Sequence, residues 1–160
     1  MYRIGSGFDI HRLAPGRPFI IAGMEIESTR GPVGHSDGDA LLHAVVDAIL
    51  GALALGDIGD HFPPSDPQWK DAKSEVFIAA ALKEMNAQGY RIENLDTTII
   101  LEKPKLGPHK KIIQEQIANM LDVDVTQVCV KAKTAEGSLG ELGQGLAIGA
   151  MATVLLAQVN

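Results

Sequence analysis

Three polar residues punctuate the apolar stretch that runs up to Leu55. Asp39, His43 and Asp47 follow one another at spacings of four, which places their side chains on one face of a helix. Burying an imidazole between two carboxylates is costly unless its nitrogens are hydrogen-bonded or hold a metal ion. The pattern fits either a structural pair of His43 with Asp47 or a functional site. The dense polar entry HSDGD, residues 35–39, favours the site.

A second pair of candidate ligands lies near the N-terminus. Asp9 and His11 are two residues apart in a segment predicted as a strand, so both side chains point to the same face, roughly 6–7 Å apart along it. With His43 they form an Asp/His/His set, and catalytic zinc sites use three protein ligands of these types with a fourth position open. The alternative is that Asp9 and His11 are polar residues at the end of a strand with no role in a site.

Periodicity and turn residues place these candidates in a chain of mixed strands and helices. We expect strands at residues 2–11, 95–102 and 125–134, a hairpin at 19–27, and helices at 40–55, at 74–87 and from 108 onward. The apolar segment 146–159 fits a buried strand or a buried helix, because periodicity cannot separate the two. Mixed elements of this kind predict a two-layer α/β or α+β domain.

Local signals add detail at the ends of these elements. Ser36 or Asp37 is expected to cap the first helix with Asp39 in its first turn, and Ser74 is expected to cap the second. Glycines inside the first strand, at positions 5 and 7, predict a bulge or a close approach of another backbone. The proline-rich loop 60–71 next to the candidate site is either a lid or an ordinary connector.

Composition bounds the function classes. The 160 residues suit one domain, 1–160, and a net charge of −6 argues against a nucleic-acid partner. Between residues 103 and 134, however, six lysines oppose three acidic residues, which suits a phosphate-bearing ligand or a solvated face. A single cysteine, Cys129, excludes an internal disulfide. With no signal-peptide core and no membrane-length apolar run, we expect a cytoplasmic protein without a membrane partner.

Five motifs resemble those of the 2-C-methyl-D-erythritol 2,4-cyclodiphosphate synthase family of the non-mevalonate isoprenoid pathway. They are GFDIH at 7–11, HSDGDALLHAVVDAILGALALGDIG at 35–59, FPPSD at 62–66, PKLGPH at 104–109 and VKAKTAEG at 130–137. They follow the order and spacing of the family nearly end to end, and the block at 35–59 is highly specific by itself. One departure is Leu146, which stands where many relatives carry a basic residue that helps bind phosphate.

The resemblance implies a lyase that acts on 4-diphosphocytidyl-2-C-methyl-D-erythritol 2-phosphate. The 2-phosphate of this substrate would attack the β-phosphorus of its own diphosphate, with release of CMP and formation of the cyclic 2,4-diphosphate. Because the nucleophile is tethered, the protein needs no nucleophilic serine or cysteine. Its task is to fold the substrate and to neutralise crowded phosphate charge.

The resemblance also assigns metals and roles. Asp9, His11 and His43 match the zinc ligands of the family, the set already reached from spacing, and Glu136 matches the ligand of a second divalent cation, Mg²⁺ or Mn²⁺. His35 and Thr134 match a catalytic pair that stabilises the transition state. Residues matched to substrate contacts are Asp9, His11, His35, Ser36, Asp57, Ile58, Gly59, Phe62, Pro63, Pro64, Ser65, Asp66, Leu101, Glu102, Lys103, Pro104, Lys105, Leu106, Gly107, Lys133, Thr134, Ala135 and Glu136.

Within that set, the segment at 57–59 would contact parts of the substrate that include the ribose. The segment at 62–66 would surround the methylerythritol portion, and the segment at 101–107 would form the cytosine pocket. Asp47 is expected to orient the imidazole of His43 from behind.

The family fold implied by the resemblance is α/β, with a mixed sheet of ferredoxin-like type and helices packed on one side. The family forms a homotrimer with active sites between subunits, which would make segment 146–159 a strand and account for the excess of apolar surface.

Two other function classes stay open from the residues. Two histidines and a carboxylate also hold iron(II) in oxygenases, although such sites usually stand on β-rich scaffolds. Iron content with oxygen consumption would support that class. A non-catalytic module that binds cytidine nucleotides is the other alternative, and release of CMP from the cytidyl substrate would exclude it.

Overall fold

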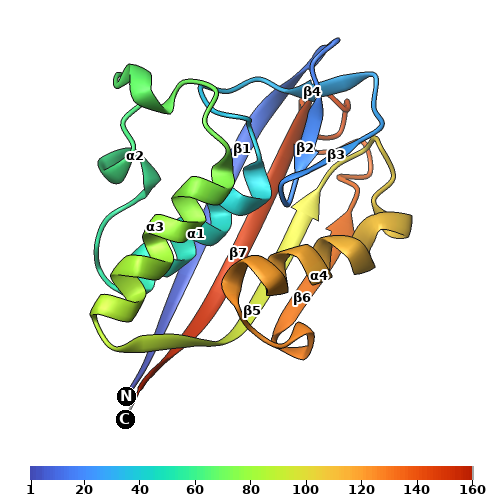
Figure 1. Ribbon diagram of the computed structural model, residues 1–160. Helices are drawn as coiled ribbons and strands as arrows, with labels where there is room; N and C mark the ends of the chain where they lie inside the picture. The colour runs from blue at the N-terminus through green and yellow to red at the C-terminus, as the bar shows by residue number, and fades with distance from the viewer. Residues whose placement is uncertain (160) are drawn as a thin grey trace.

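The computed structural model describes residues 1–159 and contains a five-stranded mixed sheet in the order β4-β1-β7-β5-β6. Its strands are β1 (Tyr2–Pro15), β4 (Arg30–Pro32), β5 (Tyr90–Ile100), β6 (Val128–Lys133) and β7 (Ala147–Gln158). β5 and β6 run parallel, and the other pairs are antiparallel. Three helices cover one face of the sheet: α1 (Ala40–Ala52), α3 (Ser74–Ala87) and α4 (Lys110–Leu121) (Figure 1).

The remaining elements are short. A hairpin of β2 (Phe19–Ile21) and β3 (Met24–Ile26) forms a separate two-stranded sheet, as expected from the turn at Gly23. In the chain, helix α2 (Ile58–His61) follows α1 and precedes α3. Single 3-10 turns occur at Pro67–Trp69, Gly107–His109 and Val125–Gln127. Within residues 1–159, no helix has the length and apolar character needed to cross a membrane.

The mixed sheet with helices on one side confirms the predicted α/β class. Leaving out the short β2, β3, β4 and α2 and the 3-10 turns, the chain runs β-α-α-β-α-β-β. A ferredoxin-like fold runs β-α-β-β-α-β. The order of connections therefore does not support the ferredoxin-like label, although the layers are those expected.

Segment 146–159 forms β7, so the strand alternative is confirmed. β7 pairs with β1 on one side and β5 on the other, which makes it a central strand of the sheet. Its residues beneath the helices, such as Ala150, Val154 and Leu156, are fully buried. Residues of its uncovered face, such as Met151, Leu155 and Ala157, are apolar as well, so β7 lacks the alternation that separates a strand from a helix in sequence.

The predicted helix caps were wrong. Asp39, not Ser36 or Asp37, caps α1, because its carboxylate accepts the backbone N–H of Leu42 at 3.0 Å. Ser74 is the first residue of α3 rather than its cap, and Asp37 accepts the Ser74 backbone N–H at 2.8 Å. Several boundaries also moved. The first helix ends at residue 52, β1 continues to Pro15, β5 begins at Tyr90, α4 begins at Lys110, and residues 125–127 form a turn before β6.

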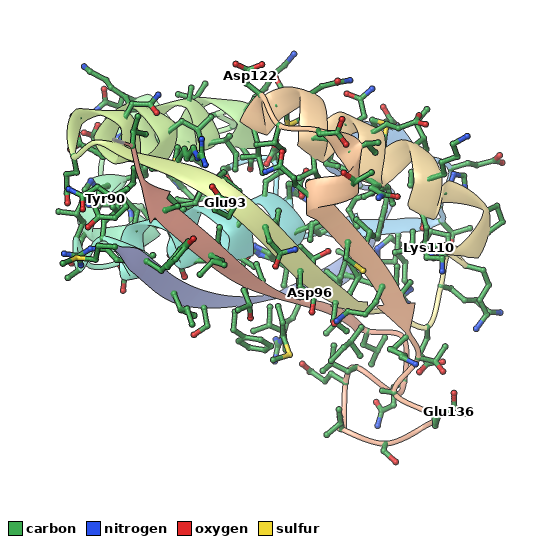
Figure 2. The ribbon with its side chains drawn as sticks, turned by 90° about the horizontal axis from the view of Figure 1, so that it is seen from below. Tyr90, Glu93, Asp96, Lys110, Asp122 and Glu136 are labelled. Atoms are coloured by element: carbon green, nitrogen blue, oxygen red, sulfur yellow. The ribbon has the colours of Figure 1, made fainter. Side chains whose placement is uncertain are left out.

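The opposite face of the sheet is not covered by helices. In Figure 2 the helices lie above the sheet and the side chains below it are free of them. On β1, residues alternate between the two faces, so Ile4, Phe8 and Ile10 point to the open face and are 73%, 52% and 49% exposed. Met151 of β7 adds to this apolar strip at 50% exposure.

Helix α1 lies unusually close to β1, at the two glycines that the sequence singled out. A Cβ placed on Gly5 would come within 1.9 Å of the Ala48 carbonyl oxygen, and one on Gly7 within 2.0 Å of the Ala44 carbonyl oxygen. The prediction of a close backbone approach is therefore confirmed. Only glycine leaves room for the backbone of α1 at these positions.

We predict that Gly7→Ala destabilises the protein by at least about 3 kcal/mol, because the clash is with backbone that no side-chain rotation relieves. Urea unfolding measures this loss. Gly51→Ala is a matched control within α1, where a new Cβ would meet nothing closer than 3.8 Å. It should be neutral or stabilise by about 0.5–1 kcal/mol through helix propensity. Equal stability of Gly7→Ala and wild type would contradict the close packing of α1 on β1.

Candidate metal centre

Three of the predicted ligands converge at the junction of β1 and α1. The Asp9 Oδ2 atom lies 2.8 Å from His11 Nε2 and 2.9 Å from His43 Nδ1, and the two ring nitrogens are 3.2 Å apart. Ligand atoms held about 2.0–2.1 Å from a tetrahedral zinc ion lie about 3.3 Å from one another. The set therefore fits zinc after the side chains separate by about half an ångström. The grouping of Asp9, His11 and His43 into a set that could hold a metal is confirmed.

The electrostatics of the set suit a cation. Burial alone would raise the pKa of Asp9, but hydrogen bonds and charge from His11 and His43 hold it well below its usual range. Burial would lower the pKa of His11, whereas the hydrogen bond and charge of Asp9 raise it above its ordinary value. The carboxylate is thus ionised, as a metal ligand must be.

Each histidine presents one nitrogen to the set and uses the other elsewhere. His11 Nδ1 lies 3.0 Å from the Val33 carbonyl oxygen and donates its proton there, so in the neutral ring Nε2 is the nitrogen that can bind a metal ion. His43 is buried on α1, with Nδ1 facing Asp9 and Nε2 facing the hydroxyls of Ser74 at 2.9 Å and Ser36 at 3.2 Å.

The three polar residues along one face of α1, Asp39, His43 and Asp47, have three separate roles. Asp39 is fully buried, where it caps α1 and accepts the Gly23 N–H at 2.8 Å, and burial raises its pKa. Asp47 accepts the N–H of Ile58 at 2.8 Å, and burial with the nearby Asp57 raises its pKa. The prediction that Asp47 orients His43 is wrong, because Asp47 holds the start of α2 instead.

A cavity of about 250 Å³ opens beside the three ligands. Predicted site residues that line it are Asp9, His11, His35, Ser36, His43, Ile58, Gly59, Phe62 and Pro64. Asp57, just before α2, does not line it but caps that helix through the Asp60 N–H. Likewise, Asp66 accepts the Gln68 N–H and caps the turn at Pro67–Trp69.

Aromatic rings form the apolar wall of this cavity. The ring of Phe62 lies 4.6 Å from that of Phe77 and 5.0 Å from that of Trp69, centroid to centroid. Trp69 and Phe77 line the cavity but were not predicted as site residues. The only tryptophan in a proline-rich loop was an available signal for Trp69, whereas Phe77 reads as ordinary packing of a helix.

The other predicted site residues form a second group at the ends of β5 and β6. The Leu101 N–H donates to the Lys133 carbonyl, and the Ala135 N–H donates to Glu102 Oε1 at 2.7 Å. Glu102, Lys103 and Lys105 line a cavity of about 340 Å³. Glu136 is exposed on a loop that projects from the body of the protein, and the Thr134 hydroxyl donates to it (Figure 2).

Within one chain, the two groups are separated across the sheet. His11 pairs with Ile148 of β7, whose neighbour Gly149 pairs with Ile100 of β5, and Ile100 pairs with Lys133 of β6. Three strand spacings separate His11 from Lys133, or about 14 Å. Lys131 and Lys133 alternate with the buried Val128 and Val130, so they point to the open face.

Comparisons with known proteins agree on one relationship. A sequence model of the YgbB family matches residues 2–157. The chain is similar to the chloroplastic 2-C-methyl-D-erythritol 2,4-cyclodiphosphate synthase of Arabidopsis thaliana, with 53% identity over 155 residues that cover 97% of this chain and 67% of that protein.

Solved structures agree in fold. A 2C-methyl-D-erythritol-2,4-cyclodiphosphate synthase in its CDP-bound form matches with a TM-score of 0.90 and 39% identity, covering 97% of this chain and 100% of that one. The bifunctional IspDF from Campylobacter jejuni matches with a TM-score of 0.93 and 37% identity over 100% of this chain. This chain spans only 43% of that bifunctional protein.

We predict that His43→Ala lowers zinc affinity by more than about 100-fold, since loss of an outer partner alone costs 10–100-fold. Metal analysis after dialysis measures the effect, with circular dichroism to verify the fold. His61→Ala is the control, because this exposed histidine contacts the Leu55 carbonyl and lies outside the cavity. Full zinc occupancy in His43→Ala would remove this residue from the ligand set.

Proposed function

The chain belongs to the YgbB family, and from this premise we propose that it is a 2-C-methyl-D-erythritol 2,4-cyclodiphosphate synthase of isoprenoid precursor biosynthesis. The proposed reaction converts 4-diphosphocytidyl-2-C-methyl-D-erythritol 2-phosphate to the cyclic diphosphate, which makes the protein a phosphorus–oxygen lyase. A 2-phosphate oxygen bonds to the β-phosphorus, and CMP departs with the bridging oxygen and its electron pair. The observation that carries the proposal is the Asp9/His11/His43 set facing a cavity in a chain of this family.

On this proposal, the residues around the first cavity hold the reacting phosphates. Asp9, His11 and His43 hold Zn²⁺, which supplies Lewis-acid polarisation of phosphate oxygens when bound. His35 and Ser36 line the same cavity. They donate hydrogen bonds to the β-phosphate, on which charge develops in the transition state. The aromatic wall of Phe62, Trp69 and Phe77 excludes water from one side and packs against the methylerythritol carbons.

The second group is proposed to bind the nucleotide end of the substrate. Residues 101–107 form the cytosine pocket, and Lys133 with Thr134 contacts the diphosphate. Support comes from the local basic charge of Lys103 and Lys105 and from the CDP-bound form of a structural relative. Glu136 is proposed to hold a second divalent cation, Mg²⁺ or Mn²⁺, which neutralises diphosphate charge when bound. An acidic chain can then accept an anionic substrate.

A homotrimer with active sites between subunits is part of the proposal. One supporting observation is the separation of about 14 Å between the two groups within one chain, which a neighbouring copy can close. The other is the uncovered apolar strip of Ile4, Phe8, Ile10 and Met151 on the open face of the sheet. Contiguous exposed apolar surface of this kind marks an interaction surface. A cytoplasmic location also stays a proposal, since the Arabidopsis relative is named as chloroplastic.

Incubation with the cytidyl substrate, Zn²⁺ and Mg²⁺ tests the proposed reaction directly. Chromatography should detect CMP, and phosphorus NMR should detect a cyclic diphosphate in equal amount. Zinc-loaded protein that releases no CMP would refute the synthase activity and leave a binding module. Iron in place of zinc, with oxygen consumption, would support the oxygenase class instead.

We predict that Phe8→Glu breaks the trimer without unfolding the chain, because its side chain points away from the helices and is 52% exposed. Light scattering should report one third of the wild-type mass, and CMP release should fall with it. Val76→Glu is the control, since Val76 is 48% exposed on the outer surface of α3. An active monomer of wild-type protein would refute the shared site.

We predict that Glu136→Gln weakens the Mg²⁺ or Mn²⁺ dependence and lowers kcat more than it weakens CMP binding, because charge is most concentrated in the transition state. Zinc content and oligomer mass should stay at wild-type levels, since the zinc ligands lie in the other group. Glu141→Gln is the control, because Glu141 lies in the same glycine-rich segment, residues 135–145, and pairs with Arg12 at 3.3 Å. Normal turnover of Glu136→Gln at low Mg²⁺ would remove Glu136 as a metal ligand.

A further inference from the structure

The Nε2 atom of His43, which faces away from the metal set, meets a buried chain of hydrogen bonds. It lies 2.9 Å from Ser74 Oγ, and the Ser74 hydroxyl lies 2.5 Å from Asp37 Oδ1. We infer that Ser74 and Asp37 are positioning residues that hold the His43 ring through Nε2 and so aim its Nδ1 at the metal. This inference rests on the metal centre of the proposed function. It goes beyond that function by naming what orients the buried ligand.

The direction of the bonds follows from what each group can donate. An ionised carboxylate only accepts, so the single hydroxyl proton of Ser74 points to Asp37. The lone pairs of Ser74 Oγ then face His43, and the contact at 2.9 Å requires a proton on Nε2. When a metal ion holds Nδ1, the one proton of the neutral imidazole is on Nε2, where Ser74 accepts it. Nδ1 is the nitrogen that faces Asp9 and His11.

The chain of bonds is built into the backbone around it. Asp37 Oδ2 also accepts the Ser74 backbone N–H at 2.8 Å, and the Asp37 N–H donates to the Ala72 carbonyl. A further bond joins the Asp71 N–H to the His35 carbonyl. The loop after His35 and the start of α3 are thus tied together, and Ser74 is fully buried. Buried, fully satisfied networks hold their members in one arrangement.

The same bonds constrain Ser36. Its hydroxyl oxygen lies 3.2 Å from His43 Nε2, which already carries a proton, so Ser36 can only accept there. The hydroxyl proton of Ser36 is consequently free to point into the cavity that it lines. The tautomer of one histidine therefore sets the donor direction of a second residue beside the metal.

Zinc affinity and the hydrogen bond at His43 Nε2 test the inference in the folded protein, without turnover. Variants Ser74→Ala, Asp37→Asn and the double variant are titrated with zinc against a chromophoric chelator. Nitrogen-15 NMR of the ring, in zinc-loaded protein, reports whether the proton on His43 Nε2 is hydrogen-bonded. Asp47→Asn is the matched control, because this carboxylate lies one turn further along α1 and binds the Ile58 N–H instead of the ring. Thermal unfolding in chelator verifies that every variant folds.

Ser74→Ala should lower zinc affinity by about 10–100-fold and weaken the hydrogen bond at His43 Nε2. Asp37→Asn should act in the same way, because an amide N–H₂ facing Ser74 turns the hydroxyl proton toward His43. The double variant should be no weaker than the weaker single variant, since both break one chain of bonds.

The inference is overturned if Ser74→Ala binds zinc within about twofold of wild type. It is also overturned if Asp47→Asn matches the loss seen in Ser74→Ala, or if the Nε2 proton of His43 shows no hydrogen bond in the zinc-loaded wild-type protein. Wild-type protein that binds no zinc would refute the proposed metal centre, a separate failure. Wild type is titrated first, so that failure is distinguished from a loss confined to the variants.

Discussion

The backbone contact between α1 and β1 is the constraint on which the metal centre depends. Along one face of β1, Gly5 and Gly7 give space to α1, and Asp9 and His11 follow on the same face. Because α1 rests directly on the strand, His43 comes within 2.9 Å of Asp9 although 34 residues separate them in the chain. A longer distance between helix and strand would leave these ligands apart, so packing and chemistry are fixed by the same four positions of β1.

The parts of the site that follow local rules could be predicted from sequence. Asp9 and His11 share a face because strands alternate, and His43 stood out because a buried helix rarely carries an imidazole. The residue that holds the other side of the His43 ring could not be predicted in this way. Asp47 was the natural neighbour of His43 by helical spacing, yet the ring is held by Ser74 from α3, 31 residues away. The sequence of β7 was ambiguous because this strand carries apolar residues on both of its faces.

Polar residues of the motif at 35–39 have roles that the sequence did not predict, and the cap of α1 is one of them. The motif at 35–39 was expected to start α1 through Ser36 or Asp37, but Asp39 does so from full burial. This leaves Asp37 free to hold the start of α3 and Ser36 free to face the cavity. Five consecutive residues thus serve a helix end, a second helix and the cavity at once, which accounts for the density of polar groups that first marked the site.

The separation of the two residue groups has a genetic consequence under the proposed assembly. The first group, Asp9, His11 and His43, comes from β1 and α1. The second group, which is proposed to bind the nucleotide, follows β5 and β6. A chain with a damaged first group still offers an intact second group to its neighbour, and the reverse also holds. Two alleles that are each inactive alone could therefore restore activity when co-expressed, since mixed oligomers would contain some sites built from two undamaged halves. Interallelic complementation of this kind would occur only between lesions in different groups.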